Sequence, residues 1–190
     1  MTTAAPSART AGVLATLRDW RPADAGQEVL RAEYLALVER LGDDALRKAG
    51  GPEHLTASTF ILSTDLTHVL LALHRKARAW LQVGGHVEDD DADLAAAARR
   101  EALEESGLAD VTLWREQPVE LDRHALGERF ACRAHWDVGF VALAGREETI
   151  AVSDESDDVA WWPLDALPAS TPPDLPIRLG RAVAAVRAGR

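Results

Sequence analysis

The chain has 190 residues, 47% of them apolar, which is enough to build one domain of ordinary size with an extension. Its formal net charge of −10 argues against binding to nucleic-acid polymers or anionic membranes, since both depend on positive charge. Small phosphorylated substrates stay open, because bound divalent cations would reverse the charge locally.

The cysteine content and the distribution of apolar residues favour a cytoplasmic protein. Cys132 is the one cysteine, which excludes an intrachain disulfide and suits a reducing compartment. There is no apolar run of about 18 residues and no charged-then-apolar leader. We therefore expect neither a membrane-spanning helix nor a secretory signal.

The first 50 residues carry no visible chemistry. Residues 1–12 are small and polar, which predicts disorder. Apolar residues at helical spacing predict helices over 13–20 and 27–49, and Gly50-Gly51-Pro52 ends that pattern. We expect an α-helical extension that packs on the following domain or mediates a homodimer.

The rest of the chain alternates between strands and helices. A helix is expected after the glycines at 84–85 and another over 175–187. Strand-like runs are predicted at 55–62, 69–73, 80–83, 111–115, 119–121, 131–143 and 159–162. This order argues for the α/β class, with helices layered on a mixed sheet.

Three glutamates mark the first of these helices as a functional element. Glu101, Glu104 and Glu105 stand at i, i+3 and i+4, so their side chains converge on one face of a helix. That helix is expected to be capped by Asp91 or Asp93 and to end before Gly107. Clustered carboxylates repel one another unless a cation lies among them, and the pattern therefore predicts a metal site. A solvated helix face is the alternative.

The segment from Gly85 to Leu108 resembles the box that defines the Nudix hydrolases. Gly85 matches its leading glycine, and Arg100 to Leu108 match its second half without a gap. Two departures lie between them: Asp91 stands where a glutamate is expected, and eight residues instead of seven separate it from Arg100. The similarity extends over roughly residues 55–168 and ends in an aromatic-Pro-Leu segment.

This resemblance implies an α/β/α sandwich and a metal-dependent hydrolase that cleaves the diphosphate linkage of a nucleotide derivative. Residues 51–190 would form the catalytic domain with its C-terminal helix, and residues 1–50 the extension. Mg²⁺ or Mn²⁺ suits such carboxylates. The implied metal ligands are Glu101, Glu104, Glu105 and the Gly85 carbonyl. Glu101 or Glu104 could instead orient or deprotonate the attacking water.

Arg100 is expected to hold a glutamate by a charge-assisted hydrogen bond, or else to form a surface ion pair with Glu104. Glu155 is a further acid for the site, although a solvated acidic loop explains it as well. His86 could contact phosphate or set the loop. Weaker candidates are a basic patch at 74–78, stacking residues Trp80, Trp136 and Trp161, and a second metal or a base at Asp122, His124 and His135.

Two functions therefore stay open. The first is the hydrolase, and the second is a Nudix-fold module that binds a nucleotide without cleaving it. All three box glutamates are present, which favours the hydrolase, and the shifted Asp91 is the one argument for inactivity. The sequence does not select among nucleotide substrates, because selectivity resides outside the box.

Overall fold

The computed structural model describes residues 5–127 and 132–189, in which seven strands form one mixed sheet. The central strand β1 (Glu53–Ser63) pairs in parallel with β6 (Ala134–Ala144) along its whole length. Its other edge pairs first with β4 (Val83–His86) and then with β2 (His68–His74). The outer strands are β3 (Ala79–Leu81), β5 (Glu120–Ala125) and β7 (Ser156–Pro163). The mixed α/β class is confirmed.

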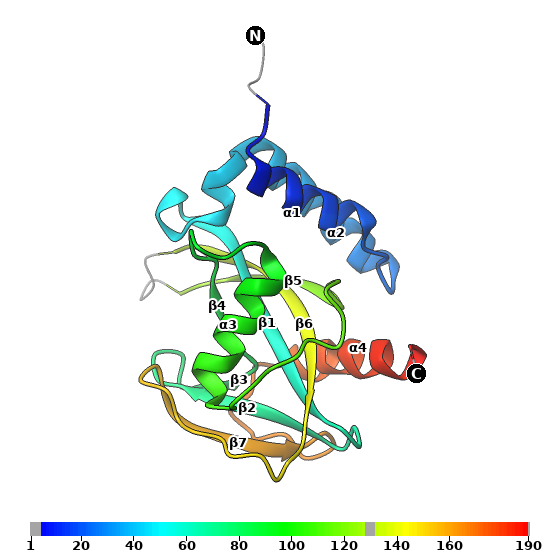
Figure 1. The fold of residues 1–190 in the computed structure, drawn as a ribbon, viewed down its shortest axis with the longest axis vertical. Coiled ribbons are helices and arrows are strands. Elements are labelled where there is room, and N and C mark those ends of the chain that lie inside the picture. The colour runs from blue at the N-terminus through cyan, green and yellow to red at the C-terminus, as the bar shows by residue number, and fades with distance from the viewer. Residues whose placement is uncertain (1–4, 128–131, 190) are drawn as a thin grey trace.

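Helices α3 (Leu94–Ser106) and α4 (Leu175–Ala188) pack on opposite faces of this sheet (Figure 1). Side chains alternate between the faces along a strand. In β1, Leu55, Ala57 and Ile61 join the apolar cluster that contains α3. Phe60 and Leu62 join the cluster that contains α4. The layered arrangement thus follows from a strand that is apolar on both sides.

The N-terminal extension packs on the domain through α1 (Ala8–Asp19) and α2 (Ala25–Leu41), which lie together at one end of the molecule in Figure 1. Tyr34 is fully buried, and its hydroxyl donates to the carbonyl oxygens of Asp122 and Asp137 at 2.7 and 2.8 Å. Gln27 bonds the backbone of Leu121 from both ends of its amide. These contacts tie the extension to β5 and β6.

The helix boundaries in the extension differ from those expected. Residues 8–12 are helical, because Ser7 caps α1 by accepting from the amide of Thr10 and both side chains bond Asp43. Residues 1–4 lie outside the described part of the chain. The second helix stops at Leu41, since Gly42 adopts a positive φ of 58° that leaves the helix. Two short 3₁₀ turns, η1 (Gly42–Leu46) and η2 (Lys48–Gly50), follow.

Several strand expectations also need correction. The run 80–83 is divided between β3 and β4, because the chain changes its partner there from β2 to β1. The glycines at 84–85 lie within β4. Residues 111–115 form only an isolated bridge between Leu113 and Ala142. The long strand begins at Ala134, and Ala131 lies outside the described residues. The strands expected at 55–62, 69–73 and 159–162 and the helix at 175–187 are present.

None of the described helices is both long and apolar enough to cross a membrane.

Candidate active site

Helix α3 carries the glutamates and is bounded as its sequence predicts. Asp93 caps its first turn by accepting from the amide of Ala96 at 2.8 Å. Gly107 ends it in the left-handed conformation, with φ of 68° and ψ of 9°. Glu101, Glu104 and Glu105 thus all lie within the helix, and their spacing places them on one side of it.

Two of the three glutamates face the sheet. The side chain of Glu101 is 14% exposed, and Glu105 is 7% exposed. Glu105 Oε2 accepts from the amide of Gly84 at 2.8 Å. A Cβ atom at Gly85 would lie 2.7 Å from the carboxylate of Glu101, so only glycine admits this approach. The β4 backbone and α3 therefore meet at the two carboxylates.

Glu104 lies at the rim of this cluster. Its side chain is 59% exposed, and Oε2 accepts from Arg100 Nη1 at 3.2 Å. Both contacts expected for Arg100 are present, because the same Nη1 also donates to Glu101 Oε1 at 3.0 Å. One guanidinium thus bonds two of the three box carboxylates.

Arg100 has a third acidic partner in Asp91, which is almost fully buried. Nε donates to Asp91 Oδ1 at 3.0 Å and Nη2 donates to Oδ2 at 2.9 Å, a bidentate arrangement. Nη2 also donates to the carbonyl oxygen of His86 at 2.9 Å. Asp91 Oδ2 accepts in turn from the amide of Glu88 at 2.8 Å. Asp91 and Arg100 together hold the connection between β4 and α3.

The glutamates lie in an electrostatic environment that suits a cation. Burial, together with the neighbouring charges of Glu104 and Glu155, raises the pKa of Glu101 to about 7 against the lowering effect of Arg100. Burial likewise raises the pKa of Glu105 to about 7. Acidic charge is thus in excess over the single guanidinium among them. A divalent cation, which carboxylate oxygens of this kind bind, would compensate this excess of negative charge.

The structure brings some of the expected site residues together and leaves others apart. Gly85, Glu101 and Glu105 lie close together, and Glu104 lies at the rim of this group. Glu155 is exposed, but it is near enough for its charge to raise the pKa of Glu101. His86 is separate from them: it pairs with Thr56 on β1, whereas Gly85 pairs with Ala57, so the two adjacent side-chain positions face opposite sides of the sheet.

His86 instead belongs to a second cluster, with His54, His135 and Cys132. One ligand atom from each of the four side chains lies within 4.8 Å of all the others. Among the described residues, this is the one group of at least three histidine, cysteine or acidic side chains whose ligand atoms lie this close together. Burial lowers the pKa of His86 to about 3 and that of His135 to about 4. The sequence pointed to His135 but not to His54 or Cys132.

His124 and Asp122, expected beside His135, form a pair of their own. His124 Nδ1 lies 2.8 Å from Asp122 Oδ2, and the rings of His124 and His135 have centroids 5.6 Å apart. Burial lowers the pKa of the His124 imidazole, but the hydrogen bond and the charge of Asp122 help to raise it, and the net shift is upward. His124 is therefore held by a carboxylate and is not one of the four clustered ligands.

A buried ionic network on the α4 side of the sheet was not foreseen. Arg178 donates to Glu120 Oε1 at 2.7 Å and to Asp137 Oδ2 at 2.8 Å, and it lies 3.4 Å from Asp122. Thr56 and Ser58 also donate to Asp137. Glu120 is fully buried. No local pattern identifies such a network, because its members come from β1, β5, β6 and α4.

Several of the remaining candidates make contacts within the protein. Arg75 bonds Asp157 and the carbonyl oxygens of Asp154 and Ser156, so it anchors the acidic loop. Trp80 packs edge-on against Trp162, and Trp136 against Tyr34. Trp161 is half-buried against the core.

A surface hollow of about 710 Å³ lies along α4 and does not include the box glutamates among its lining residues.

Comparison with known proteins identifies the same region. The sequence profile of the NUDIX domain matches residues 52–185. A hydrolase of the NUDIX family from Clostridium perfringens is 25% identical in its crystal structure, with a TM-score of 0.58, over 70% of this chain and 97% of that one. No curated protein matches the chain.

Two more distant structures share the fold. An Ap4A hydrolase from C. elegans is 20% identical with a TM-score of 0.57, over 72% of this chain and 98% of that one. The NUDIX domain of Shewanella oneidensis NrtR, crystallised with ADP ribose, is 20% identical with a TM-score of 0.51, over 82% of this chain and 97% of that one.

Proposed function

The chain belongs to the NUDIX family of pyrophosphohydrolases, and we propose that it cleaves the diphosphate linkage of a nucleoside diphosphate derivative at the glutamates of α3, with a bound divalent cation. The observation that carries this proposal is the placement of Glu101 and Glu105 against the backbone of Gly84 and Gly85. Two buried carboxylates facing a strand backbone form an oxygen-rich concentration of negative charge that a solvated helix face would not have.

Glu101, Glu104, Glu105 and the Gly85 carbonyl would hold Mg²⁺ or Mn²⁺. When bound, the cation neutralises the diphosphate, activates water and stabilises the leaving phosphate. The protein supplies the arrangement: the Gly84 amide fixes one oxygen of Glu105, and Arg100 fixes one oxygen of Glu101. Each carboxylate then keeps its second oxygen for a ligand. Glu155 is within electrostatic reach and would add a further acid from the loop before β7.

Arg100 acts as a positioning residue in this proposal. Its guanidinium is occupied by Asp91, Glu101, Glu104 and the His86 carbonyl, which leaves it little capacity to bind substrate. The bidentate pair with Asp91 fixes the guanidinium plane and therefore the direction of the bond to Glu101. The shorter Asp91 side chain serves this purpose, so its departure from the usual glutamate does not argue for an inactive protein.

Either Glu101 or Glu104 accepts the proton of the attacking water. Glu101 is packed against Gly85, whereas Glu104 reaches into solvent at the rim. The Glu101→Gln and Glu104→Gln variants separate the two roles. Loss of the base lowers kcat at saturating metal, and loss of a ligand alone raises the metal concentration needed for half-maximal activity.

The substrate class rests on the family and on the compounds named for two of the related structures. Ap4A and ADP ribose, named for the C. elegans and S. oneidensis proteins, both contain an adenosine nucleotide with a phosphoanhydride linkage. We propose a substrate of this kind. The pocket that would select among such compounds lies outside the box.

The test is phosphate or nucleotide release from a panel of nucleoside diphosphate derivatives, with Mg²⁺, with Mn²⁺ and with chelator. The proposal expects turnover of at least one compound that chelator abolishes and added metal restores. Nucleotide binding without turnover across the panel would instead identify a nucleotide-binding module that does not cleave its ligand.

A further inference from the structure

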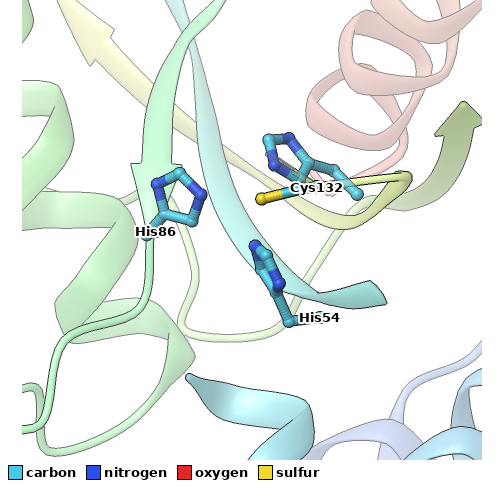
Figure 2. A group of neighbouring side chains, drawn as sticks. His54, His86 and Cys132 are labelled. Atoms are coloured by element: carbon cyan, nitrogen blue, oxygen red, sulfur yellow. The ribbon is translucent and has the colours of Figure 1, made fainter. Parts of the chain in front are cut away.

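Four potential metal ligands from separate parts of the chain meet on the face of the sheet opposite the glutamates. His54 lies on β1, His86 on β4 and His135 on β6, and Cys132 lies just before β6. The three imidazole rings have centroid separations of 5.1, 5.3 and 5.1 Å. Figure 2 shows His54, His86 and Cys132 pointing toward one another. We refer to these four residues as the His/Cys cluster.

The strand pairing explains why the His/Cys cluster forms. His54 and His135 are direct partners in the parallel pairing of β1 with β6. His86 pairs with Thr56, two residues from His54, so the alternation of the strand places His86 on the same face. The amides of Arg133 and Ala134 donate to the carbonyl oxygen of Pro52, which holds the segment containing Cys132 beside His54.

The histidines are not satisfied as ordinary core residues. Nε2 of His54, of His86 and of His135 is buried, and none of these atoms has a hydrogen-bond partner among the described residues. His54 Nδ1 lies 3.3 Å from the carbonyl oxygen of Gly51, so this nitrogen carries the proton and Nε2 offers a lone pair to the cluster. A buried polar atom without a partner destabilises the folded chain, and three such atoms on one cluster point to a shared ligand.

We propose that His54, His86, His135 and Cys132 bind one Zn²⁺ ion in a site separate from the carboxylate site. Three imidazole nitrogens and one thiolate form the donor set that tetrahedral zinc prefers, whereas Mg²⁺ and Mn²⁺ prefer oxygen. The Cys132 thiol releases its proton to solvent when it binds the metal. Four protein ligands complete a tetrahedral shell, which is characteristic of a structural zinc site and not of a catalytic one.

The position of the His/Cys cluster indicates that the zinc would stabilise the sheet by linking its strands. The ion links β1, β4 and β6 with the segment that precedes β6. His86 is adjacent to Gly85, whose opposite side contacts Glu101. Zinc would therefore fix the end of β4 from one face while α3 packs on the other, and it would add its binding free energy to the stability of the folded chain.

The experiment uses the full-length protein, stripped with chelator and reconstituted with ZnCl₂ or CoCl₂. Elemental analysis is expected to find one zinc per chain after desalting. Cobalt is expected to give the intense visible bands of a tetrahedral centre and a sulfur-to-cobalt charge-transfer band. Cys132→Ser should remove the charge-transfer band, while His68→Ala, which removes a histidine outside the cluster, should leave both features intact. Zinc should raise the melting temperature of the wild type.

Other results would overturn the zinc site. They are a reconstituted wild type that retains no zinc, a cobalt spectrum with only the weak bands of an octahedral centre, or tetrahedral bands that disappear in Glu104→Gln/Glu105→Gln. The wild-type spectrum and metal content decide the matter even if cluster variants fold poorly. Neither readout depends on hydrolysis, so this test is independent of the proposed activity.

Discussion

Asp91 and Arg100 form a bidentate ion pair across the loop between β4 and α3, with N···O distances of 3.0 and 2.9 Å. The side chain of Asp91 is 6% exposed and also accepts from the amide of Glu88. The pair therefore joins the loop to the helix and fixes the guanidinium that holds Glu101. A carboxylate that looks displaced in the sequence is thus central to the arrangement of the box.

Replacing Asp91 by asparagine should weaken both stability and catalysis. The change removes the negative charge that pairs with Arg100 and one of the two oxygens that accept from its guanidinium. We expect the free energy of unfolding to fall by about 1–3 kcal/mol. We expect kcat/KM to fall by about tenfold or more as Glu101 loses its fixed partner. Thermal unfolding and steady-state kinetics measure the two effects. Asp90→Asn, an exposed neighbour, is the control, and equal behaviour of the two variants would contradict this role.

Gly85→Ala should impair catalysis more than folding. The added Cβ would lie 2.7 Å from the carboxylate of Glu101, and the flexible end of that side chain can move away at small cost. Its displacement changes the position of a proposed metal ligand. We expect kcat/KM to drop by about tenfold or more while the melting temperature changes little. Gly12→Ala, with no neighbour within 4 Å, is the control. Full activity in Gly85→Ala would show that the close approach has no role.

Glu101 and Glu105 should each lower the stability of the metal-free protein as pH rises, whereas His86 and His135, whose pKa values burial lowers to about 3 and about 4, act in the opposite direction. Glu101 and Glu105 have pKa values raised to about 7 by burial, so between about pH 4.5 and 7 the folded chain binds more protons than the unfolded chain. Linkage then makes the contribution of the two glutamates to the free energy of unfolding decrease with pH through that window, by at most about 1.4 kcal/mol per pH unit for each group.

Denaturant unfolding in chelator at pH 5 and pH 8 measures this dependence. Because glutamine does not titrate, the difference in stability between Glu105→Gln and wild type should shift in favour of the variant from pH 5 to pH 8. Metal binding competes with these protons, so the affinity for Mg²⁺ should increase from pH 5 to pH 8. An identical pH dependence of stability in wild type and Glu105→Gln would refute the assignment.

Deleting residues 1–50 should make the remaining chain unstable or poorly soluble. The deletion removes Tyr34, whose hydroxyl bonds Asp122 and Asp137, and uncovers Trp136, which packs against it. It also removes buried Leu17 and Val38 from the core. Circular dichroism and size-exclusion chromatography with light scattering measure the outcome. A soluble, folded fragment of unchanged oligomeric state would show that the extension is not a packing element.

The sequence was sufficient to predict α3 and its carboxylates. Asp93 and Gly107 mark the ends of α3 by local capping chemistry, and the i, i+3, i+4 spacing places the glutamates on one side without tertiary information. The unequal exposure of Glu104 and Glu105 was not predictable, because it depends on where β4 passes the helix. The class of fold and the closing helix α4 were also readable from the apolar pattern.

The His/Cys cluster and the Arg178 network were beyond sequence reasoning for a common reason. His54 and His135 are 81 positions apart and meet only because β1 and β6 pair in one particular register. Arg178 reaches Glu120 and Asp137 from a helix that looks like a simple cover for the sheet. Register between distant strands has no local signal in a single sequence, since several alignments bury similar apolar residues.

The most direct test of the carboxylate site compares wild type with Glu105→Gln on the substrate panel, with Mg²⁺ or Mn²⁺ and with chelator. Glu116→Gln, an exposed glutamate outside the box, is the matched control, and circular dichroism checks the fold. The account predicts metal-dependent turnover in wild type and control, and loss of about a hundredfold or more in kcat for folded Glu105→Gln. Unchanged turnover in that variant would contradict the proposed site.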